Sequence, residues 1–292
     1  MLLRDEYEQY LVNEKYVSPG TVASYFRDIK KFYNYIDKIN VKVTDVTKQT
    51  IVTYLMHMQK SGQATSSMLR MIASLRSYFG YLTRRGITAD NPLLGVETPK
   101  LPKREFEVLT SKETELFLKQ PVCKNFKGYR DRAMLELLYA TGIKVSEIIE
   151  IKLSEINLDE GFLLCGSDKN ARNVPIGRIA AEAIRNYLEK ARFVGLKPRD
   201  NELLFVNTNG GKMSRQGFWK IVKYYKEKAK IDKEITPNTL RHSFAVHLIE
   251  NGADVSSVKE MLGHTALNST RVYANLVNEK INNVYKKTHP RA

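Results

Sequence analysis

The sequence predicts a mainly α-helical protein of two domains with one small antiparallel β-hairpin. Apolar residues recur at the spacing of amphipathic helices through most of the 292 residues. One short segment instead places Gly, Ser, Asp and Asn between two apolar runs, which is typical of a hairpin turn. A stretch with prolines and basic residues, 95–109, separates two helical regions, and the length suffices for two domains of ordinary size.

The chain carries 47 Lys and Arg against 32 Asp and Glu, a formal net charge of +15. Such an excess of cations neutralises phosphates, and nucleic-acid binding depends on it. A basic surface also suits solubility or an anionic membrane, and composition alone leaves these alternatives open. A nucleic acid is the partner that the charge favours.

Residues 1–94 are expected to form a compact helical domain. Four amphipathic helices are predicted there, the first within residues 1–16. The other three follow residues that can cap a helix N-terminus, and the capping candidates are Ser18, Thr47, and Ser66 or Ser67. Arg70 and Arg76 fall outside the apolar stripe of the fourth helix, so they are candidates for contacts with a phosphate backbone.

The stretch 95–109 is expected to join the two domains as an extended linker. Asp90-Asn91-Pro92 ends the helical pattern before it, and its own prolines and glycine disfavour regular elements. Three cations in the stretch are placed to follow a phosphate backbone: Lys100, Lys103 and Arg104. The same composition also suits a merely solvated connector.

Residues 110–292 are expected to form the second domain. Thr110 and Glu113 make a capping box at the start of its first helix. The segment 129–142 predicts a further helix, which Gly142 ends.

A β-hairpin is predicted where two apolar runs, 162–164 and 174–176, flank the sequence GSDKNARN. Its basic turn contains Lys169 and Arg172, which are candidate DNA contacts. Further helices are predicted at 178–192 and 214–230.

Several residue types that often carry chemistry are expected to be structural here. Cys123 and Cys165 show no metal-ligand spacing and are predicted to be small buried residues in a reducing compartment. Trp219 is expected in the core, and His242 and His247 are expected to have structural roles. The sequence has no metal-ligand spacing, nucleotide-binding loop or apolar run of membrane-spanning length. We therefore expect no cofactor, no membrane partner and a cytoplasmic location.

The stretch 236–273 gathers groups suited to attack on a phosphodiester. Arg241 falls near the first turn of a helix predicted over 239–250, where backbone N–H groups also favour an anion. His264 directly follows the glycine that ends the next helix, and Tyr273 lies on a last helical stretch. A guanidinium, an imidazole and a phenol therefore occur together, although each signal alone is weak.

Four ordered segments carry a resemblance: RDRAMLELLYATGIKVSEI, VPIG at the end of the hairpin, LRHSFAVHLIENGAD and MLGHTALNSTRVYANL. Together with the four-helix amino-terminal unit, they resemble the tyrosine recombinases, particularly the Xer type. The resemblance implies a C-shaped clamp on double-stranded DNA at a specific site, with a homo- or hetero-tetramer of protomers on two duplexes. It also implies that the carboxy-terminal helix docks into a neighbour and that no metal or nucleotide takes part.

The resemblance assigns catalytic roles to six positions. Tyr273 corresponds to the nucleophile that forms a 3′-phosphotyrosyl link, Arg241 to the second arginine and His264 to the later histidine. The other positions depart from the family's pattern: Lys144 stands for the first arginine, Ser167 for the hairpin lysine and Asn238 for the first histidine. Lysine lacks the planar fork of arginine, serine is no cationic acid, and asparagine cannot shuttle a proton. Lys169 is an alternative proton donor for the hairpin.

Two hypotheses of different classes follow. In the first, the protein is a recombinase that exchanges DNA strands with a weakened or rewired active site. In the second, it is a DNA-binding member of the same fold that assembles at a site or supports an active partner without cutting. Resemblance to the Xer type favours a role in chromosome segregation and cell division over a mobile element, by analogy alone.

Overall fold

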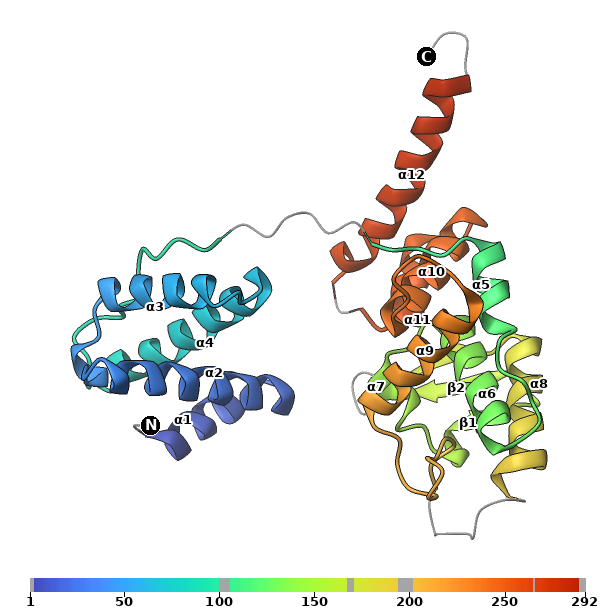
Figure 1. Ribbon diagram of the computed structural model, residues 1–292, viewed down its shortest axis with the longest axis horizontal. Coiled ribbons are helices and arrows are strands. Elements are labelled where there is room, and N and C mark those ends of the chain that lie inside the picture. The colour runs from blue at the N-terminus through green and yellow to red at the C-terminus, as the bar shows by residue number, and fades with distance from the viewer. Residues whose placement is uncertain (1–2, 100–105, 167–170, 194–201, 265, 289–292) are drawn as a thin grey trace. The chain divides into compact units, whose positions relative to one another are not determined.

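The computed structural model describes residues 3–99, 106–166, 171–193, 202–264 and 266–288, with side chains only to residue 278 in the last range. The chain divides into two compact units, Met1–Arg104 and Glu105–Ala292, and each is described by itself (Figure 1). Both are mainly helical and the second also contains a small sheet, which confirms the predicted fold class.

The first unit is a four-helix assembly, as predicted. Its helices are α1 (Arg4–Gln9), α2 (Pro19–Lys38), α3 (Lys48–Lys60) and α4 (Thr65–Arg84), with a π-helical turn at Tyr10–Glu14 and a 3₁₀ turn at Val43–Asp45. Ser18 and Thr47 cap α2 and α3, because their hydroxyls accept backbone N–H groups three residues on. The predicted start of the fourth helix at Ser66 or Ser67 is wrong, since the carbonyl of Ala64 already accepts the first helical hydrogen bonds.

The core of the first unit contains a buried carboxylate. Asp28 on α2 is 1% exposed among apolar and aromatic side chains. Arg70 donates from Nε and Nη2 to its two oxygens at 2.8 and 3.0 Å, and Ser74 donates to it at 3.1 Å. The guanidinium of Arg70, a candidate DNA contact, is therefore bound to Asp28, although the Arg70 side chain is 48% exposed. Arg76 lies exposed on the same helix.

Both ends of the predicted linker 95–109 pack against a core, so it is not a solvated connector throughout. Val96 is 8% exposed and belongs to the core of the first unit. Leu109 is fully buried in the core of the second. The candidate DNA contacts of this stretch, Lys100, Lys103 and Arg104, lie outside the described residues.

Within the described residues, the second unit combines eight α-helices, a 3₁₀ turn at Leu153–Glu155, a π-helical stretch at Leu188–Arg192 and a sheet. The helices are α5 (Ser111–Leu118), α6 (Phe126–Thr141), α7 (Val145–Ile148), α8 (Arg178–Tyr187), α9 (Arg215–Ala229), α10 (Pro237–Glu250), α11 (Val255–Leu262) and α12 (Asn268–Thr288). The strands β1 (Ile156–Asn157), β2 (Phe162–Cys165) and β3 (Arg172–Pro175) pair antiparallel in that order. The predicted hairpin is thus confirmed, and β1 extends it by a strand that the sequence did not indicate.

The helix α6 forms the centre of this unit and packs against α8 and α10. The helix ends at position 142, where a glycine is required both by the backbone conformation and by the lack of room for a side chain. Gly142 has a φ of 59°, and a Cβ there would lie 2.3 Å from the Phe244 ring. The close approach brings the end of α6 against α10, which carries Arg241.

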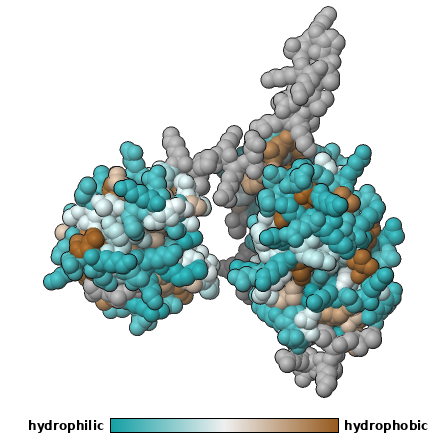
Figure 2. Space-filling model, viewed as in Figure 1, coloured by the Kyte–Doolittle hydropathy of each residue, from teal (hydrophilic) through white to brown (hydrophobic). Residues whose placement is uncertain are grey.

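Two predictions of burial in this unit are wrong. Trp219 is 47% exposed; Phe218 and Val222 take the inward face of α9, and the next residue points about 100° away. Cys123 is exposed, because it lies in the connection between α5 and α6, whereas Cys165 in β2 is buried as expected. Figure 2 shows hydrophilic residues over most of the visible face of each unit.

We expect Arg70→Met to destabilise the protein, because the buried Asp28 carboxylate loses the guanidinium that donates to both its oxygens. The expected loss is about 1–3 kcal/mol in the free energy of unfolding. Urea denaturation followed by circular dichroism measures it. Arg76→Met on the same helix is the matched control and should change the free energy by less than about 0.5 kcal/mol. Equal effects of the two substitutions would contradict the role given to Arg70.

Candidate functional site

Arg241 is held on α10 by the ends of two other helices. Thr236 caps α10, and Pro237 occupies its first position. Arg241 lies in the second turn, is 6% exposed, and donates from Nη1 to the carbonyl of Gly142 and from Nη2 to that of Leu262 at 2.8 Å. These carbonyls are available because α6 and α11 end there. Burial lowers the pKa of Arg241 below its usual value.

His264 projects from a fixed turn beside this guanidinium. It follows Gly263, which ends α11 in a left-handed conformation with a φ of 64°. Its Nδ1 lies 2.9 Å from the hydroxyl of Thr270. Burial, with the charges of Arg241 and Lys144, lowers the pKa of His264 to about 4. The imidazole is therefore neutral at pH 7.

Tyr273 on α12 is 3% exposed and lies between two imidazoles. Its hydroxyl is 2.9 Å from Nδ1 of His242, and its ring stacks near that of His264 with the centroids 6.4 Å apart. Burial raises the pKa of the Tyr273 phenol, and the charge of Arg241 opposes the rise. The structure thus brings together Tyr273, His264 and Arg241, as predicted.

His242 contacts Tyr273 directly, which the sequence did not suggest. Burial and the charge of Arg241 lower the pKa of His242 to about 4, so its ring is also neutral at pH 7. His247, one turn further along α10, is structural as expected: it lies 2.9 Å from the hydroxyl of Tyr139 and 2.8 Å from the carbonyl of Leu109.

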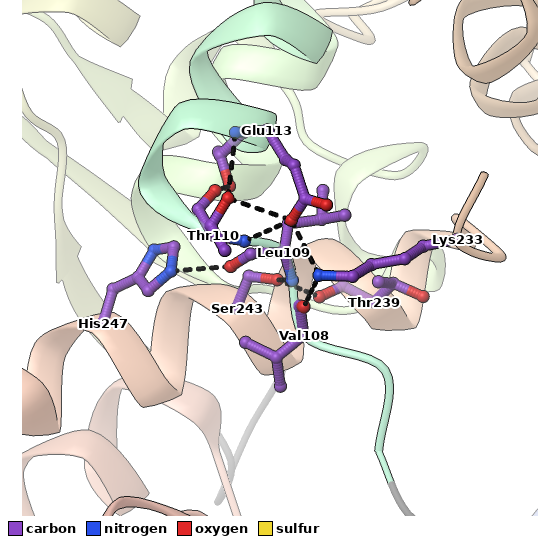
Figure 3. A network of polar contacts seen from close by, with 9 residues as sticks. Val108, Leu109, Thr110, Glu113, Lys233, Thr239, Ser243 and His247 are labelled. Atoms are coloured by element: carbon purple, nitrogen blue, oxygen red, sulfur yellow. Dashed lines mark hydrogen bonds and ion pairs between the residues drawn. The ribbon is translucent and has the colours of Figure 1, made fainter. Parts of the chain in front are cut away.

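The opposite side of α10 anchors the chain that leads into the unit (Figure 3). Leu109 donates its N–H to the hydroxyl of Ser243 at 2.9 Å, and its carbonyl meets His247 at 2.8 Å. Lys233 donates to Glu113 at 2.8 Å and to the carbonyl of Val108 at 3.1 Å. The segment after Phe106 is thereby fixed to the helix that carries Arg241 and His242.

Lys144 and Asn238 line a pocket of about 320 Å³, and Lys144 is also close enough to His264 for its charge to lower the pKa of that imidazole. The turn before α7 contributes Lys144, α9 contributes Arg215 and Trp219, and the first turn of α10 contributes Asn238. Arg241, His264 and Tyr273 are not among its lining residues. Arg215 and Trp219 were missed as site residues, although their i, i+4 spacing at the start of α9 places them on one face.

Glu147 links the Lys144 turn to the hairpin. Its Oε2 accepts the N–H of Lys144 at 2.7 Å, and the Arg172 guanidinium donates to both its oxygens at 3.0 and 3.2 Å. Arg172 also donates from Nε to the carbonyl of Met261 at 2.8 Å, at the end of α11. Burial disfavours the charge of Glu147, but the hydrogen bonds from Arg172 and Lys144 outweigh it and lower the pKa.

The side chain of Arg172 is only 11% exposed, so it is not the exposed turn residue that the sequence indicated. It belongs to β3, and its guanidinium points back to Glu147 because the half-buried carboxylate offers two acceptors. Ser167 and Lys169, the other hairpin candidates, lie outside the described residues.

Known proteins resemble this chain over nearly its whole length. Residues 107–280 match the phage integrase family, and residues 5–86 match the phage integrase N-terminal SAM-like domain. The tyrosine recombinase XerD of Halalkalibacterium halodurans is 41% identical over 282 residues, 96% of this chain and 94% of that protein. The XerD of Staphylococcus epidermidis is 40% identical over 290 residues, 99% of this chain and 98% of that protein.

Solved structures share the fold at lower identity. The XerH site-specific recombinase bound to a palindromic difH substrate has a TM-score of 0.77 at 20% identity, covering 97% of this chain and 84% of that one. The Tn1549 transposon integrase in complex with a circular intermediate DNA has a TM-score of 0.75 at 17% identity, covering 92% and 93%.

The described part of the chain holds no group of three or more His, Cys, Asp or Glu side chains placed to bind a metal ion. None of its helices in the ranges given above is long and apolar enough to cross a membrane.

We expect Glu147→Gln to remove stability in a pH-dependent way. The pKa of Glu147 in the folded protein lies below 4.5, so its charge stabilises the fold above that pH, and the contribution is lost as the pH falls through the lowered value. The variant should lose about 1–3 kcal/mol of unfolding free energy at pH 7. Its difference from the wild type should shrink as the pH falls below 4.5.

Urea denaturation at a series of pH values measures this difference. Glu150→Gln is the control, because Glu150 forms an exposed pair with Lys212 and should change stability by less than about 0.5 kcal/mol. A Glu147→Gln difference that stays constant with pH would contradict the assignment.

Proposed function

We propose that this chain, which belongs to the phage integrase family, is a site-specific tyrosine recombinase that binds duplex DNA and exchanges its strands. The observation that carries the proposal is the position of His264 and Arg241 next to the buried phenol of Tyr273. The relatives named recombinases match both units of the chain, not the second alone.

In the proposed reaction, the phenol oxygen of Tyr273 attacks a DNA phosphorus and loses its proton. The bond from phosphorus to the 5′ oxygen breaks, and that oxygen leaves as a hydroxyl after taking up a proton. The guanidinium of Arg241 would stabilise the negative oxygens of the transition state. Because the bond energy stays in the 3′-phosphotyrosyl link, neither a nucleotide nor a metal is required.

The departures at three positions weaken this chemistry. Lys144 keeps a cation but not a bidentate donor, and losing one such donor lowers a rate by about 10²–10³. Ser167 and Asn238 remove a proton donor and an imidazole, and general acid catalysis is worth about 10²–10⁴. Such losses do not add within one catalytic unit.

A second candidate function is DNA binding without cleavage, as an accessory member of the family. The pocket that Lys144 and Asn238 share with Arg215 and Trp219 favours it. Cations, an amide and an indole bind a phosphate and a base without proton transfer. In either case we propose a location with the DNA in the cytoplasm and assembly as a tetramer of like or paired protomers.

The net charge of +15 supports DNA engagement in both candidates. We retain several cations as proposed contacts with the DNA backbone: Arg76, Lys100, Lys103, Arg104 and Lys169. Arg70 and Arg172 are less suited, because their guanidinium groups are held by Asp28 and Glu147.

A nicked suicide substrate tests the recombinase proposal. Duplexes that the protein binds are first selected from a randomised library and then nicked, so that a cleaved fragment diffuses away and the covalent complex accumulates. We expect a protein–DNA band in a denaturing gel with the wild type and none with Tyr273→Phe. Tyr224→Phe, which alters an exposed tyrosine of the same unit, should keep the band. Tight binding without any band would favour the non-cutting candidate.

Restoring the family's residues should raise the cleavage rate. We expect the triple variant Lys144→Arg, Ser167→Lys and Asn238→His to form the covalent complex at least about 10²-fold faster than the wild type. The initial rate on the same substrate measures this. The triple variant with Tyr273→Phe is the control and should stay inactive. An unchanged rate in a folded, DNA-binding triple variant would show that these positions do not limit the reaction.

A further inference from the structure

Tyr273, the proposed nucleophile, is covered by an aromatic residue from far along the chain. The ring centroid of Phe106 lies 4.7 Å from that of His242 and 6.1 Å from that of Tyr273. Phe106 is the second residue of the unit Glu105–Ala292, and it precedes the anchored segment at Leu109. The reaction scheme above gives it no role.

The phenol oxygen is occupied within this cluster. It lies 2.9 Å from Nδ1 of His242, within hydrogen-bond distance. A neutral imidazole accepts the phenol hydrogen at Nδ1 in the tautomer that carries its own hydrogen on Nε2, and donates to the phenol oxygen in the other tautomer. Phe106 packs on the same imidazole and limits its rotation. His242 thus fixes the hydroxyl, and Phe106 fixes His242.

The same geometry keeps a DNA phosphate from the phenol. Tyr273 is 3% exposed, whereas an attacking oxygen must come within about 3–3.5 Å of the phosphorus. Arg241, which would bind that phosphate, donates from both terminal nitrogens to main-chain carbonyls. The arrangement suits a resting nucleophile.

We propose that Phe106 and His242 are positioning residues that hold Tyr273 in a resting geometry, and that attack requires the Phe106 ring to leave the His242–Tyr273 pair. The inference rests on the proposed function, because it treats Tyr273 as the nucleophile. Under this proposal, a residue at the start of the second unit determines when the Tyr273 hydroxyl can react. This control acts by contact, since Phe106 touches both rings.

Solvent access to Tyr273 tests the proposal independently of cleavage. The full-length protein is labelled with 3-fluorotyrosine, and the ¹⁹F resonance missing from Tyr273→Phe is assigned to Tyr273. We expect a soluble nitroxide to broaden this resonance little in the wild type and at least about fivefold more in Phe106→Ala, the factor in an equilibrium that one aromatic pair is worth. Phe193→Ala, at an exposed phenylalanine of the same unit, should leave it unchanged.

Two outcomes would overturn the proposal: a Tyr273 resonance already open to the nitroxide in the wild type, or equal broadening in Phe106→Ala. If Phe106→Ala does not fold, Phe106→Leu keeps an apolar side chain there and should give a smaller change in the same direction.

Substitutions at His242 separate positioning from simple packing. His242→Ala should raise the nitroxide broadening of the Tyr273 resonance, whereas His242→Asn should bring it back part of the way to the wild-type value. Its amide places a polar atom where Nδ1 lies but offers Phe106 no ring to pack on. Failure of the asparagine to restore any protection would contradict a role through the hydrogen bond.

The suicide substrate supplies the link to chemistry. Phe106→Ala should form the covalent complex at least about fivefold faster than the wild type, and a slower rate would overturn the resting role. If no variant cleaves DNA while the resonance behaves as expected, the holding contact stands and the recombinase proposal fails.

Discussion

Two helices of the second unit end at glycines, and the guanidinium of Arg241 binds the carbonyl groups found there. The bonds run to Gly142 at the end of α6 and to Leu262 at the end of α11. Without them a charge would be buried and unpaired, at a free energy of several kcal/mol. Together with the apolar face of α10, these bonds fix the helix against both helix ends, and hence His242 and the packing around Tyr273. The group proposed to bind phosphate is also a structural cross-link.

A second position, at Lys144, also belongs both to the proposed site and to the scaffold that supports it. Glu147 joins the turn at Lys144 to Arg172 on β3, and Arg172 continues to the end of α11. The family's first arginine would stand at Lys144, so its replacement leaves this scaffold intact, because Glu147 binds the backbone N–H and not the side chain. The fold can therefore tolerate a lysine at this position.

Local signals in the sequence predicted the helix ends well. Thr110 with Glu113 acts through neighbouring residues and depends little on the rest of the fold. Gly142 ends α6 through its own left-handed conformation, a local signal, although the glycine also leaves room for Phe244. The partners of Arg172 and Tyr273 were not predictable in this way. Arg172 meets a carboxylate 25 residues away and a carbonyl 89 residues away. Arg172 is engaged because the fold brings the Glu147 carboxylate to it, and Trp219 is exposed because Phe218 and Val222 take the inward face of α9.

The anchoring of Leu109 on α10 also has a mechanical consequence. The N–H and the carbonyl of one residue bind Ser243 and His247, which lie one turn apart on the same helix. A pull on the chain ahead of Leu109 therefore loads both bonds in parallel and is borne by α10 as a rigid body of 14 residues. Phe106 lies on the pulled side of that anchor. Tension would displace the Phe106 ring before it disturbed Arg241. The residue that covers Tyr273 therefore yields to force more easily than the residue proposed to bind phosphate.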